Sequence, residues 1–417
     1  MAARPGARRS RRRDAPGAAR RRPQPPRPPR AAGRRPPDAR RRTDVPGGGA
    51  AAAARPRRLP GCARDGHRFR RAARGGRPPR ARRRRRELRQ GVGTSCVVAL
   101  DAGGTHTRAA CFALDGALLG RAEGPAGAWH HHDDAVENLR STVHRALAGA
   151  GVEVSGVCAL VAGVAGISSR GTDDGAGGDR SREWAARHLA VPELSCPQVF
   201  VNDAVTAHRG ALLGRPGVIV VAGTGSMVMA IAADGAEVEN GQLAHYAGAA
   251  RHLVLDAVHR VLAGRAVPAD DAFVAGLLEA LGADGVTALR RLALDLELRE
   301  GQHAVTRRFG PAAPLVTAAA DTSPLADAAL RALAERTATG VLLLAPLVGT
   351  DPVEVTTTGS LATDRAFTVR LSAALSGGGS SAVLVPASVD AVRGAALMAF
   401  DLVGSVDDAV LDRLLHP

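Results

Sequence analysis

The stretch at residues 96–108 constrains the fold of this chain more than any other. It reads Cys-Val-Val-Ala-Leu-Asp-Ala-Gly-Gly-Thr-His-Thr-Arg, so an apolar run ends in an aspartate, and glycines and threonines follow. Such a run bounded by glycines predicts a buried strand, a tight turn and the start of a second strand. The foldable part of the chain is therefore expected to open with a β-hairpin.

The polar residues of this turn suit a phosphate group. Glycine lets the backbone approach a ligand closely, and free N–H groups and hydroxyls bind phosphate oxygens. The residues with these properties are Gly103, Gly104, Thr105 and Thr107. Asp101 could hold a hydrated Mg²⁺ beside the phosphates, although a strand-end aspartate can also simply accept turn N–H groups. We favour ligand binding, and the stretch predicts a nucleotide site.

A second strand–turn–strand resembles the first. Residues 217–226 read Gly-Val-Ile-Val-Val-Ala-Gly-Thr-Gly-Ser and lead into another apolar strand. The two units align without a gap, and the equivalent positions are Gly104-Thr105 with Gly223-Thr224, Thr107 with Ser226, and Asp115-Gly116 with Asp234-Gly235. Two similar hairpins indicate an internally duplicated α/β architecture. A plain hairpin turn is the alternative for the second unit.

Positive charge is concentrated at the start of the chain. Residues 1–90 hold 32 arginines and five acidic residues, a net charge of +27, and because the whole chain has +16 the remaining residues sum to −11. The residues at 1–92 are mostly Arg, Pro, Gly and Ala, which cannot build a core, so we expect a disordered tail. It could be an arginine-rich arm for nucleic acid, but the aromatic residues that stack on bases are almost missing. A solvated tail or a start site assigned too far upstream is favoured.

Other residue types exclude several classes of protein. The chain has no lysine, so it cannot carry the P-loop motif that ends in Gly-Lys-Ser/Thr. The five cysteines, Cys62, Cys96, Cys111, Cys158 and Cys196, form no Cys-x-x-Cys pair, which indicates buried thiols in a reducing compartment. No apolar run reaches membrane-spanning length, and the first residues lack the apolar core of a signal peptide. We therefore expect a cytoplasmic protein with no membrane partner.

The pattern of apolar residues predicts alternating helices and strands between and after the hairpins. Asp134 with Glu137 indicates a capping box at the start of a helix. Strands are predicted over 157–162, 198–201, 354–358 and 382–385, and helices over 181–189, 246–262, 324–344 and 389–402.

Four short motifs occur in one order along the chain. They are Asp101-x-Gly-Gly-Thr-x-Thr, Asn202-Asp203-Ala204, Gly223-Thr-Gly-Ser226 and Thr358-Gly-Ser-Leu361. Together they resemble the sugar kinase/actin/Hsp70 superfamily, and within it the BadF/BadG/BcrA/BcrD ATPase family, which includes N-acetylglucosamine kinase. The resemblance covers residues 95–405.

The resemblance implies an α/β fold of two ribonuclease-H-like (actin-like ATPase) domains with ATP in the cleft between them. We place these domains at 93–212 and 213–388, and we expect a C-terminal helix in 389–417 to pack back on the N-terminal domain. The first turn would hold the phosphates and Mg²⁺. We expect the second turn to face the same phosphates with Gly223, Thr224, Gly225 and Ser226. Gly359 and Ser360 would lie near the adenosine.

Asp203 is the candidate general base. It follows a short apolar strand, and sites in α/β folds form at the carboxyl ends of strands. A carboxylate there could accept the proton of a substrate hydroxyl that attacks the γ-phosphate. The alternative is that Asn202 and Asp203 only cap the helix that follows. With the other motifs we favour catalysis, and we assign Asn202 to the substrate.

The substrate region departs from the family's pattern. Family kinases often have an asparagine near the position of Trp129, which we assign to the substrate, and this chain has none before Asn138. The histidines at 130–132 invite a metal hypothesis, but consecutive histidines rarely bind one ion, so a solvent loop is favoured. The family's Gly-Asp-Glu-Gly-Ser stretch is replaced by 240–251, which contains Tyr246 and Arg251. Tyr246 could stack on a sugar or lie in the core; Arg251 could meet an anionic substrate, though a surface position is favoured.

These residues predict an ATP-dependent small-molecule kinase that phosphorylates a hydroxyl of an amino sugar, N-acetylglucosamine or glucosamine, or of a related polyol. One alternative is an ATPase activator of a radical dehydratase or reductase, which in this family needs cysteines for a shared iron–sulfur cluster. Cys158 and Cys196 are too isolated to favour it. Another is a catalytically silent nucleotide-binding regulator, suggested by the missing acids. The expected partners are a sugar and ATP, and a homodimer is among the possible assemblies.

Overall fold

The chain is described here from a computed structural model, which covers residues 94–129, 134–167, 180–377, 380–404 and 406–416. Three predictions lie outside these residues: the disordered tail at 1–92, the environment of Cys62, and the solvent loop with histidines at 130–132. The domain limits proposed from the sequence stay predictions.

The first sheet has five strands in the order β3-β2-β1-β4-β5. They are β1 (Cys96–Ala102), β2 (His106–Ala113), β3 (Leu118–Pro125), β4 (Val157–Val164) and β5 (Gln198–Val201). β1, β2 and β3 pair antiparallel, whereas β4 and β5 run parallel to β1. The first sheet therefore combines a meander of three strands with two parallel crossovers.

The second sheet repeats this topology in the order β10-β9-β6-β7-β8. Its strands are β6 (Gly217–Ala222), β7 (Ser226–Ile231), β8 (Glu237–Glu239), β9 (Val353–Thr358) and β10 (Ala382–Leu384). β6, β7 and β8 again pair antiparallel, and β9 and β10 again run parallel to the first strand. The predicted internal duplication is confirmed.

The turns that follow the second strand of each hairpin, at Asp115-Gly116 and Asp234-Gly235, have the same hydrogen bond and the same backbone conformation. The N–H of Ala117 donates to Asp115 Oδ1 over 3.1 Å, and the N–H of Ala236 donates to Asp234 Oδ1 over 3.0 Å. The glycines that follow the two aspartates have φ angles of 93° and 87°, in the left-handed region that favours glycine. The two hairpin loops also have the same length, since three residues (103–105) separate β1 from β2 and three (223–225) separate β6 from β7.

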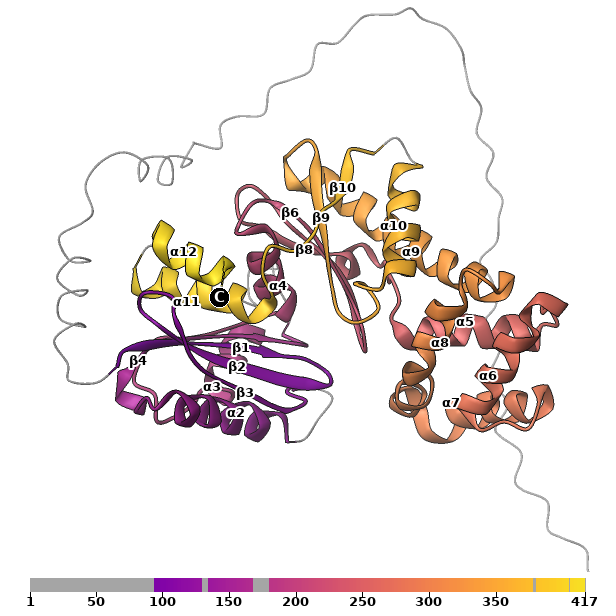
Figure 1. Ribbon diagram of the computed structural model, residues 1–417, viewed down its shortest axis with the longest axis horizontal. Helices are drawn as coiled ribbons and strands as arrows, with labels where there is room; N and C mark the ends of the chain where they lie inside the picture. Colours follow the sequence, from indigo (N-terminus) through magenta and orange to yellow (C-terminus); the bar gives the residue numbers. More distant parts are fainter. Residues whose placement is uncertain (1–93, 130–133, 168–179, 378–379, 405, 417) are drawn as a thin grey trace, which may run out of the picture. The chain divides into compact units, whose positions relative to one another are not determined.

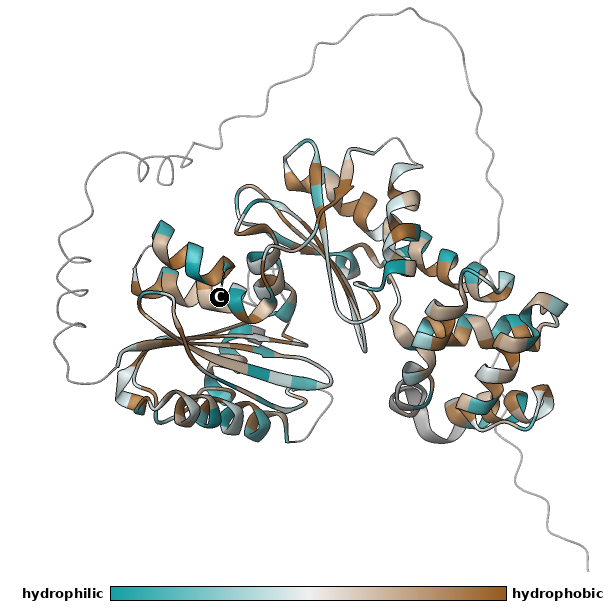
Figure 2. Cartoon of the chain, in the orientation of Figure 1, coloured by the Kyte–Doolittle hydropathy of each residue, from teal (hydrophilic) through white to brown (hydrophobic). Residues whose placement is uncertain are grey.

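Helices cover both faces of the first sheet (Figure 1). Side chains alternate along β1: Cys96 and Val98 face a core that includes α2 (Ala135–Ala150), whereas Val97 and Ala99 face α11 (Ala391–Val403) and α12 (Asp408–Leu415). Figure 2 shows the matching pattern, with apolar residues along β1 and polar residues on the outer side of α2. The last two helices of the chain thus complete the core of its first sheet.

The second sheet packs its Val218 and Val220 face against a group of helices, and its Ile219 face against α4. The group comprises α5 (Ala250–Leu262), α6 (Asp271–Leu281), α7 (Val286–Phe309), α8 (Ala313–Ala319), α9 (Pro324–Val348) and α10 (Arg365–Ser376). The helix α4 (Asp203–Leu212) follows β5 and also contacts α11. Two glycines let α4 and α11 approach closely, because a Cβ on Gly394 would lie 2.6 Å from the backbone nitrogen of Gly210.

Several predicted elements differ from the structure. The helix expected over 246–262 begins at Ala250, because Gly248 has a φ of 99°. The capping box at Asp134 is wrong: Asp134 precedes α2, but its side chain makes no capping hydrogen bond. The strand at 198–201 is confirmed.

Within the described part of the chain, no single helix has both the length and the apolar composition that a membrane crossing needs. The helix pair Pro268–Leu281 and Val286–Leu296, bent by 46°, meets both criteria only when taken together.

Candidate functional site

The turns of the two duplicated hairpins meet. Thr105 Oγ1 and Thr224 Oγ1 are 3.1 Å apart, so one hydroxyl donates to the other. The backbone is close here as well, because a Cβ on Gly104 would lie 3.5 Å from the Cβ of Thr224. Nothing lies within 4 Å of the equivalent point at Gly225. The structure thus brings together residues that the sequence placed around one phosphate site, with open space beside Gly225.

The loop after β9 lies against the second turn. The N–H groups of Leu361 and Ala362 both donate to the carbonyl of Ala222, over 3.1 and 3.0 Å. Gly359 has a φ of 95°, and a Cβ there would lie 2.5 Å from the same carbonyl. A side chain is therefore excluded at Gly359, and Ser360 is held next to Gly223.

Thr107 and Ser226, which are equivalent in the two hairpins, have buried hydroxyls. Neither hydroxyl has a hydrogen-bond partner within the described residues. Thr107 has no exposed surface, and a Cβ on Gly127 would lie 2.5 Å from its Oγ1. Both hydroxyls therefore point into the protein, and their contact with phosphate stays a prediction.

Asp101 ends β1 with its carboxylate mostly buried. In the antiparallel register it lies opposite Arg108, whose Nη1 is 4.0 Å from Asp101 Oδ2. Burial raises the pKa of Asp101 to about 6, the charge of Arg108 lowers it, and the charge of Asp390 raises it. Arg108 and Asp390 were not recognised in the sequence. Arg108 could have been found from the hairpin register, but Asp390 lies almost three hundred residues away.

Asp203 is the first residue of α4, immediately after the cap residue Asn202. Asn202 Oδ1 accepts from the N–H of Ala204 over 2.8 Å, and its Nδ2 donates to the carbonyl of Ile167 over 2.5 Å. Only 1 % of Asn202 is exposed, so its amide positions the start of the helix. The assignment of Asn202 to the substrate stays a prediction.

The environment of Asp203 favours its protonated form. Burial, the negative charge of Asp101 and, less strongly, that of Glu239 together raise its pKa to about 7, although the N–H of Ala204 acts to lower it. Asp101 and Asp203 are thus close enough to interact through their charges. Glu239, at the end of β8, is buried and was missed in the sequence because no motif marks it.

The two aspartates fit a magnesium ion that has few protein ligands. Among the described residues, no group of three or more His, Cys, Asp or Glu side chains could hold a metal. Mg²⁺ in nucleotide sites takes only one or two carboxylates together with phosphate oxygens and water. A cation beside Asp101 and Asp203 would also offset the burial and the neighbouring negative charges that raise both pKa values.

The two aromatic residues assigned to the substrate lie in different surroundings. Trp129 packs against Trp184 with ring centroids 4.3 Å apart and is partly covered by the first core. Tyr246 is 46 % exposed and meets His252 edge-on, with centroids 5.0 Å apart. Exposure leaves the ring of Tyr246 accessible to a ligand. Substrate contact stays a prediction for both residues.

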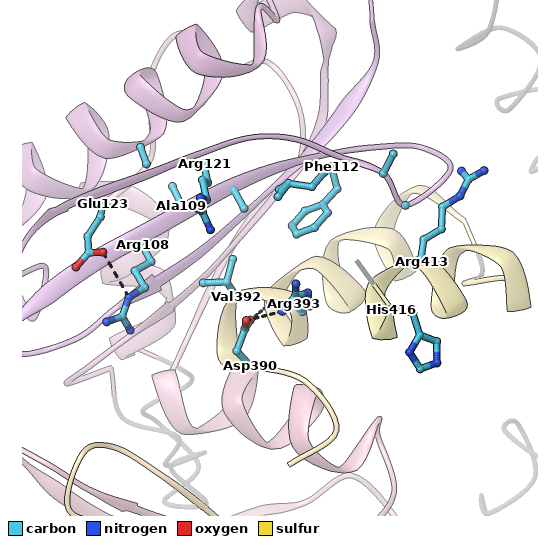
Figure 3. A pocket seen from close by; sticks show the side chains of 15 residues that line it. Arg108, Ala109, Phe112, Arg121, Glu123, Asp390, Val392, Arg393, Arg413 and His416 are labelled. Atoms are coloured by element: carbon cyan, nitrogen blue, oxygen red, sulfur yellow. Dashed lines mark hydrogen bonds and ion pairs between the residues drawn. The ribbon is translucent and has the colours of Figure 1, made fainter. Parts of the chain in front are cut away.

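A cavity of about 850 Å³ lies between the β2–β3 hairpin and the helices α11 and α12 (Figure 3). Phe112 and Val392 provide apolar lining, and arginines such as Arg121 and Arg393 provide positive charge. The cavity adjoins Asp101 through Arg108, but none of the glycines and threonines in the turns at 103–107 and 223–226 lines it. It is therefore a separate feature from the meeting point of the two turns.

The repeated sheet topology and the paired glycine turns define an ATPase of the two-domain, actin-like α/β class. The model of the BadF/BadG/BcrA/BcrD ATPase family matches residues 98–399, and the chain belongs to this family. The resemblance and the fold class expected from the sequence are confirmed, and membership implies the use of ATP. Among curated proteins, none matches the chain in sequence.

Two solved structures share this fold. A proposed N-acetylglucosamine kinase from Chromobacterium violaceum is 25% identical, with a TM-score of 0.52, over 75% of this chain and 99% of that one. A second proposed N-acetylglucosamine kinase, from Porphyromonas gingivalis, is 19% identical with a TM-score of 0.52, over 73% of this chain and 99% of that one.

Proposed function

We propose that the chain is an ATP-dependent kinase that phosphorylates a hydroxyl of a sugar, with an amino sugar of the N-acetylglucosamine or glucosamine type as the candidate class. The observation that carries the proposal is the position and charge state of Asp203. It is the first residue of α4, just after β5, it interacts with the negative charge of Asp101, and its pKa is about 7. A general base is most effective when its pKa is near the working pH.

Each residue then has one role in the transfer. Asp203 accepts the proton of the acceptor hydroxyl while that oxygen forms its bond to the γ-phosphorus, and the bond from this phosphorus to the bridging oxygen breaks to release ADP. The open space beside Gly225 leaves room for phosphate oxygens near the turn of Gly103 and Gly104, and Gly359 keeps the neighbouring loop close to the second turn. Asp101 would hold Mg²⁺, which when bound neutralises charge on the phosphates.

The alternative of an ATPase activator is not favoured by the described cysteines. Burial raises the pKa of the Cys158 thiol and raises that of Cys196 to about 11. A cysteine binds a metal as the thiolate, and burial makes this thiolate harder to form at both positions than at an exposed cysteine. The silent regulator is not favoured either, because it gives no role to Asp203 beside Asp101.

The proposal is tested by measuring ADP release with a panel of neutral and charged amino sugars, sugar acids, sugar phosphates and polyols. We expect ADP formation that depends on one class of acceptor and on Mg²⁺. Tight ATP binding without acceptor-dependent turnover would contradict the kinase proposal and favour the regulator.

A further inference from the structure

The cavity between the β2–β3 hairpin and the helices α11 and α12 has no part in the proposed kinase reaction. Its volume of about 850 Å³ lies within the range of about 300–1,000 Å³ that is usual for small-molecule sites. None of the residues assigned above to phosphate, metal, acceptor or proton transfer lines it. The cavity is therefore large enough to hold a ligand of its own.

The register of the hairpin places charged side chains on the cavity's side of the sheet. Arg108 lies opposite Glu123 across the two strands, and Ala110 lies opposite Arg121. Residues two apart in a strand face the same side, so Arg108 shares a face with Ala110 and Phe112, which pack towards α11 and α12. Arg121 and Glu123 lie on this face as well, and Figure 3 shows both side chains at the cavity.

The two carboxylates of the lining already have arginine neighbours. Arg393 Nη1 donates to Asp390 Oδ2 over 2.8 Å. Arg108 Nε lies 4.0 Å from Glu123 Oε2, and the same side chain is 4.0 Å from Asp101 through its Nη1. A ligand with positive charge would have to compete with these arginines, so the lining disfavours a cation.

Arg121 supplies positive charge that these pairs do not neutralise. It makes no hydrogen bond or ion pair with any residue that the structure describes. Arg413, the remaining arginine of the lining, is paired with Asp115. The guanidinium of Arg393 makes only the bond to Asp390 among the described residues, so its other N–H groups are available to a ligand. Hydrogen bonds from such charged donors to an oxyanion are about twice as strong as neutral ones.

Another part of the lining is apolar. Phe112 of β2 and Val392 of α11 contribute to it, together with Leu118, which is exposed at the start of β3. A ligand with an apolar body would remove this surface from water, which favours binding. An inorganic anion would leave it uncovered.

We propose that this cavity binds a small organic anion that has a carboxylate or phosphate group and an apolar body. The oxyanion accepts hydrogen bonds from Arg121 and Arg393, and the apolar body packs on Phe112 and Val392. The site is separate from the place of phosphoryl transfer, and its occupation does not depend on the proposed kinase function.

The first arm of the test measures binding to the full-length protein by calorimetry, with saturating ADP and Mg²⁺ so that the nucleotide site is filled. The compounds are phenyl phosphate and phenylacetate, with inorganic phosphate, acetate and the neutral 2-phenylethanol for comparison. We expect one aromatic anion to bind at least about tenfold more tightly than its inorganic or aliphatic counterpart and than 2-phenylethanol. Which of the two binds identifies the oxyanion. Equal binding of 2-phenylethanol, or binding of neither aromatic anion, overturns the inference.

The second arm uses the full-length variant Arg121→Gln, with Arg187→Gln in α3 (Arg180–His188) as the control. Arg187 is also exposed and makes no hydrogen bond or ion pair with the described residues, but it does not line the cavity. Losing a charged hydrogen bond should weaken binding of the aromatic anion by roughly 10- to 100-fold, whereas the control should bind it like the wild type. Both variants should keep the wild-type melting temperature, because neither side chain has a partner to lose. Unchanged anion binding by Arg121→Gln contradicts the proposal.

Competition with the nucleotide separates this cavity from the two phosphate turns. Binding of the aromatic anion should be retained when ADP is saturating, and its displacement by ADP would overturn the inference. Binding that is selective and depends on Arg121 supports the inference whether or not ADP release depends on an acceptor. The failure of acceptor-dependent ADP release would contradict only the kinase proposal.

Discussion

Two effects on the ionisation of Asp203 oppose each other. The first turn of a helix favours a negative side chain, yet burial and the neighbouring charges of Asp101 and Glu239 favour the neutral form. The result is a carboxyl group poised between its two states near neutral pH. We regard this balance as the functional core of the site.

The balance predicts how the rate depends on pH. Only the ionised form of Asp203 can accept a proton, so kcat/KM should rise with pH and level off above an apparent pKa that a bound Mg²⁺ lowers from the metal-free value of about 7. Because Asp101 also titrates, near pH 6, the measured value belongs to the pair. The measurement is kcat/KM from pH 5 to 8.5, and a flat profile would count against Asp203 as the base.

The same shifts predict how stability depends on pH. The raised pKa values mean that the folded state binds these protons more tightly than the unfolded chain, where a carboxyl has a pKa of about 4. Their stabilisation is complete below that value and is lost as pH rises through about 6 and 7. At pH 8, Asp203→Asn should therefore raise the melting temperature, by about 2–4 °C for each kcal/mol regained.

A suitable control for this variant is Asp364→Asn at the start of α10. Asp364 accepts from the N–H of Ala366 over 2.8 Å, and asparagine caps helices as well as aspartate does. Its melting temperature should stay unchanged, and melting curves at pH 5 and pH 8 compare the two variants. A lower melting temperature for Asp203→Asn at pH 8 would show that the carboxylate stabilises the fold.

Single residues also show what the sequence could and could not predict. The turn glycines and Asp203 were found because short motifs mark them. Glu239 and Asp390 were missed, since their influence on the aspartates depends on tertiary contacts between distant segments. The surface position favoured for Arg251 did not anticipate its contact with His252.

At the scale of elements, the crossing of α4 and α11 connects Asp203 to a helix that packs on the first sheet. Thr206 and Gly210 of α4 lie against Gly394, with no room for a side chain between the helices. A methyl group forced into such a contact typically costs 1–3 kcal/mol, and more where it meets backbone. The position of Asp203, at the start of α4, depends on this packing.

Gly394→Ala should therefore lower stability by at least about 1–3 kcal/mol and reduce kcat. The matched control is Gly276→Ala in α6, where no atom lies within 4 Å of the added Cβ. There alanine should stabilise by up to about 1 kcal/mol through helix propensity. Urea unfolding of both variants checks the pair, and equal stability of Gly394→Ala and wild type would contradict the close crossing.

The elements that the sequence predicted are those with strong apolar patterns, such as β5 and α9. The sequence did not predict β3, whose alternate residues are largely exposed and which contains two glycines, or β8, which has only three residues. The final helix α12 was missed as well. Edge strands and short terminal helices depend on tertiary contacts more than on their own patterns.

At the scale of the whole molecule, duplication explains why a chain without lysine can form a phosphate site. Each half supplies one glycine turn on the same sheet topology, and Thr105 and Thr224 meet where the turns approach. The sequence predicted this pairing because the two hairpins align without a gap. The residues assigned to the acceptor, Asn202, Trp129 and Tyr246, have no such symmetry, and their contact with a substrate stays a prediction.

The central claim is that Asp203 serves as the base for phosphoryl transfer to an acceptor hydroxyl. Phosphorus NMR of the reaction with ATP, Mg²⁺ and the best acceptor tests it directly, with wild type and Asp203→Asn compared at equal ATP occupancy. We predict a phosphomonoester signal from the wild type and a rate about 10²- to 10⁴-fold lower for the variant. An unimpaired variant, or inorganic phosphate as the sole product of the wild type, would contradict the claim.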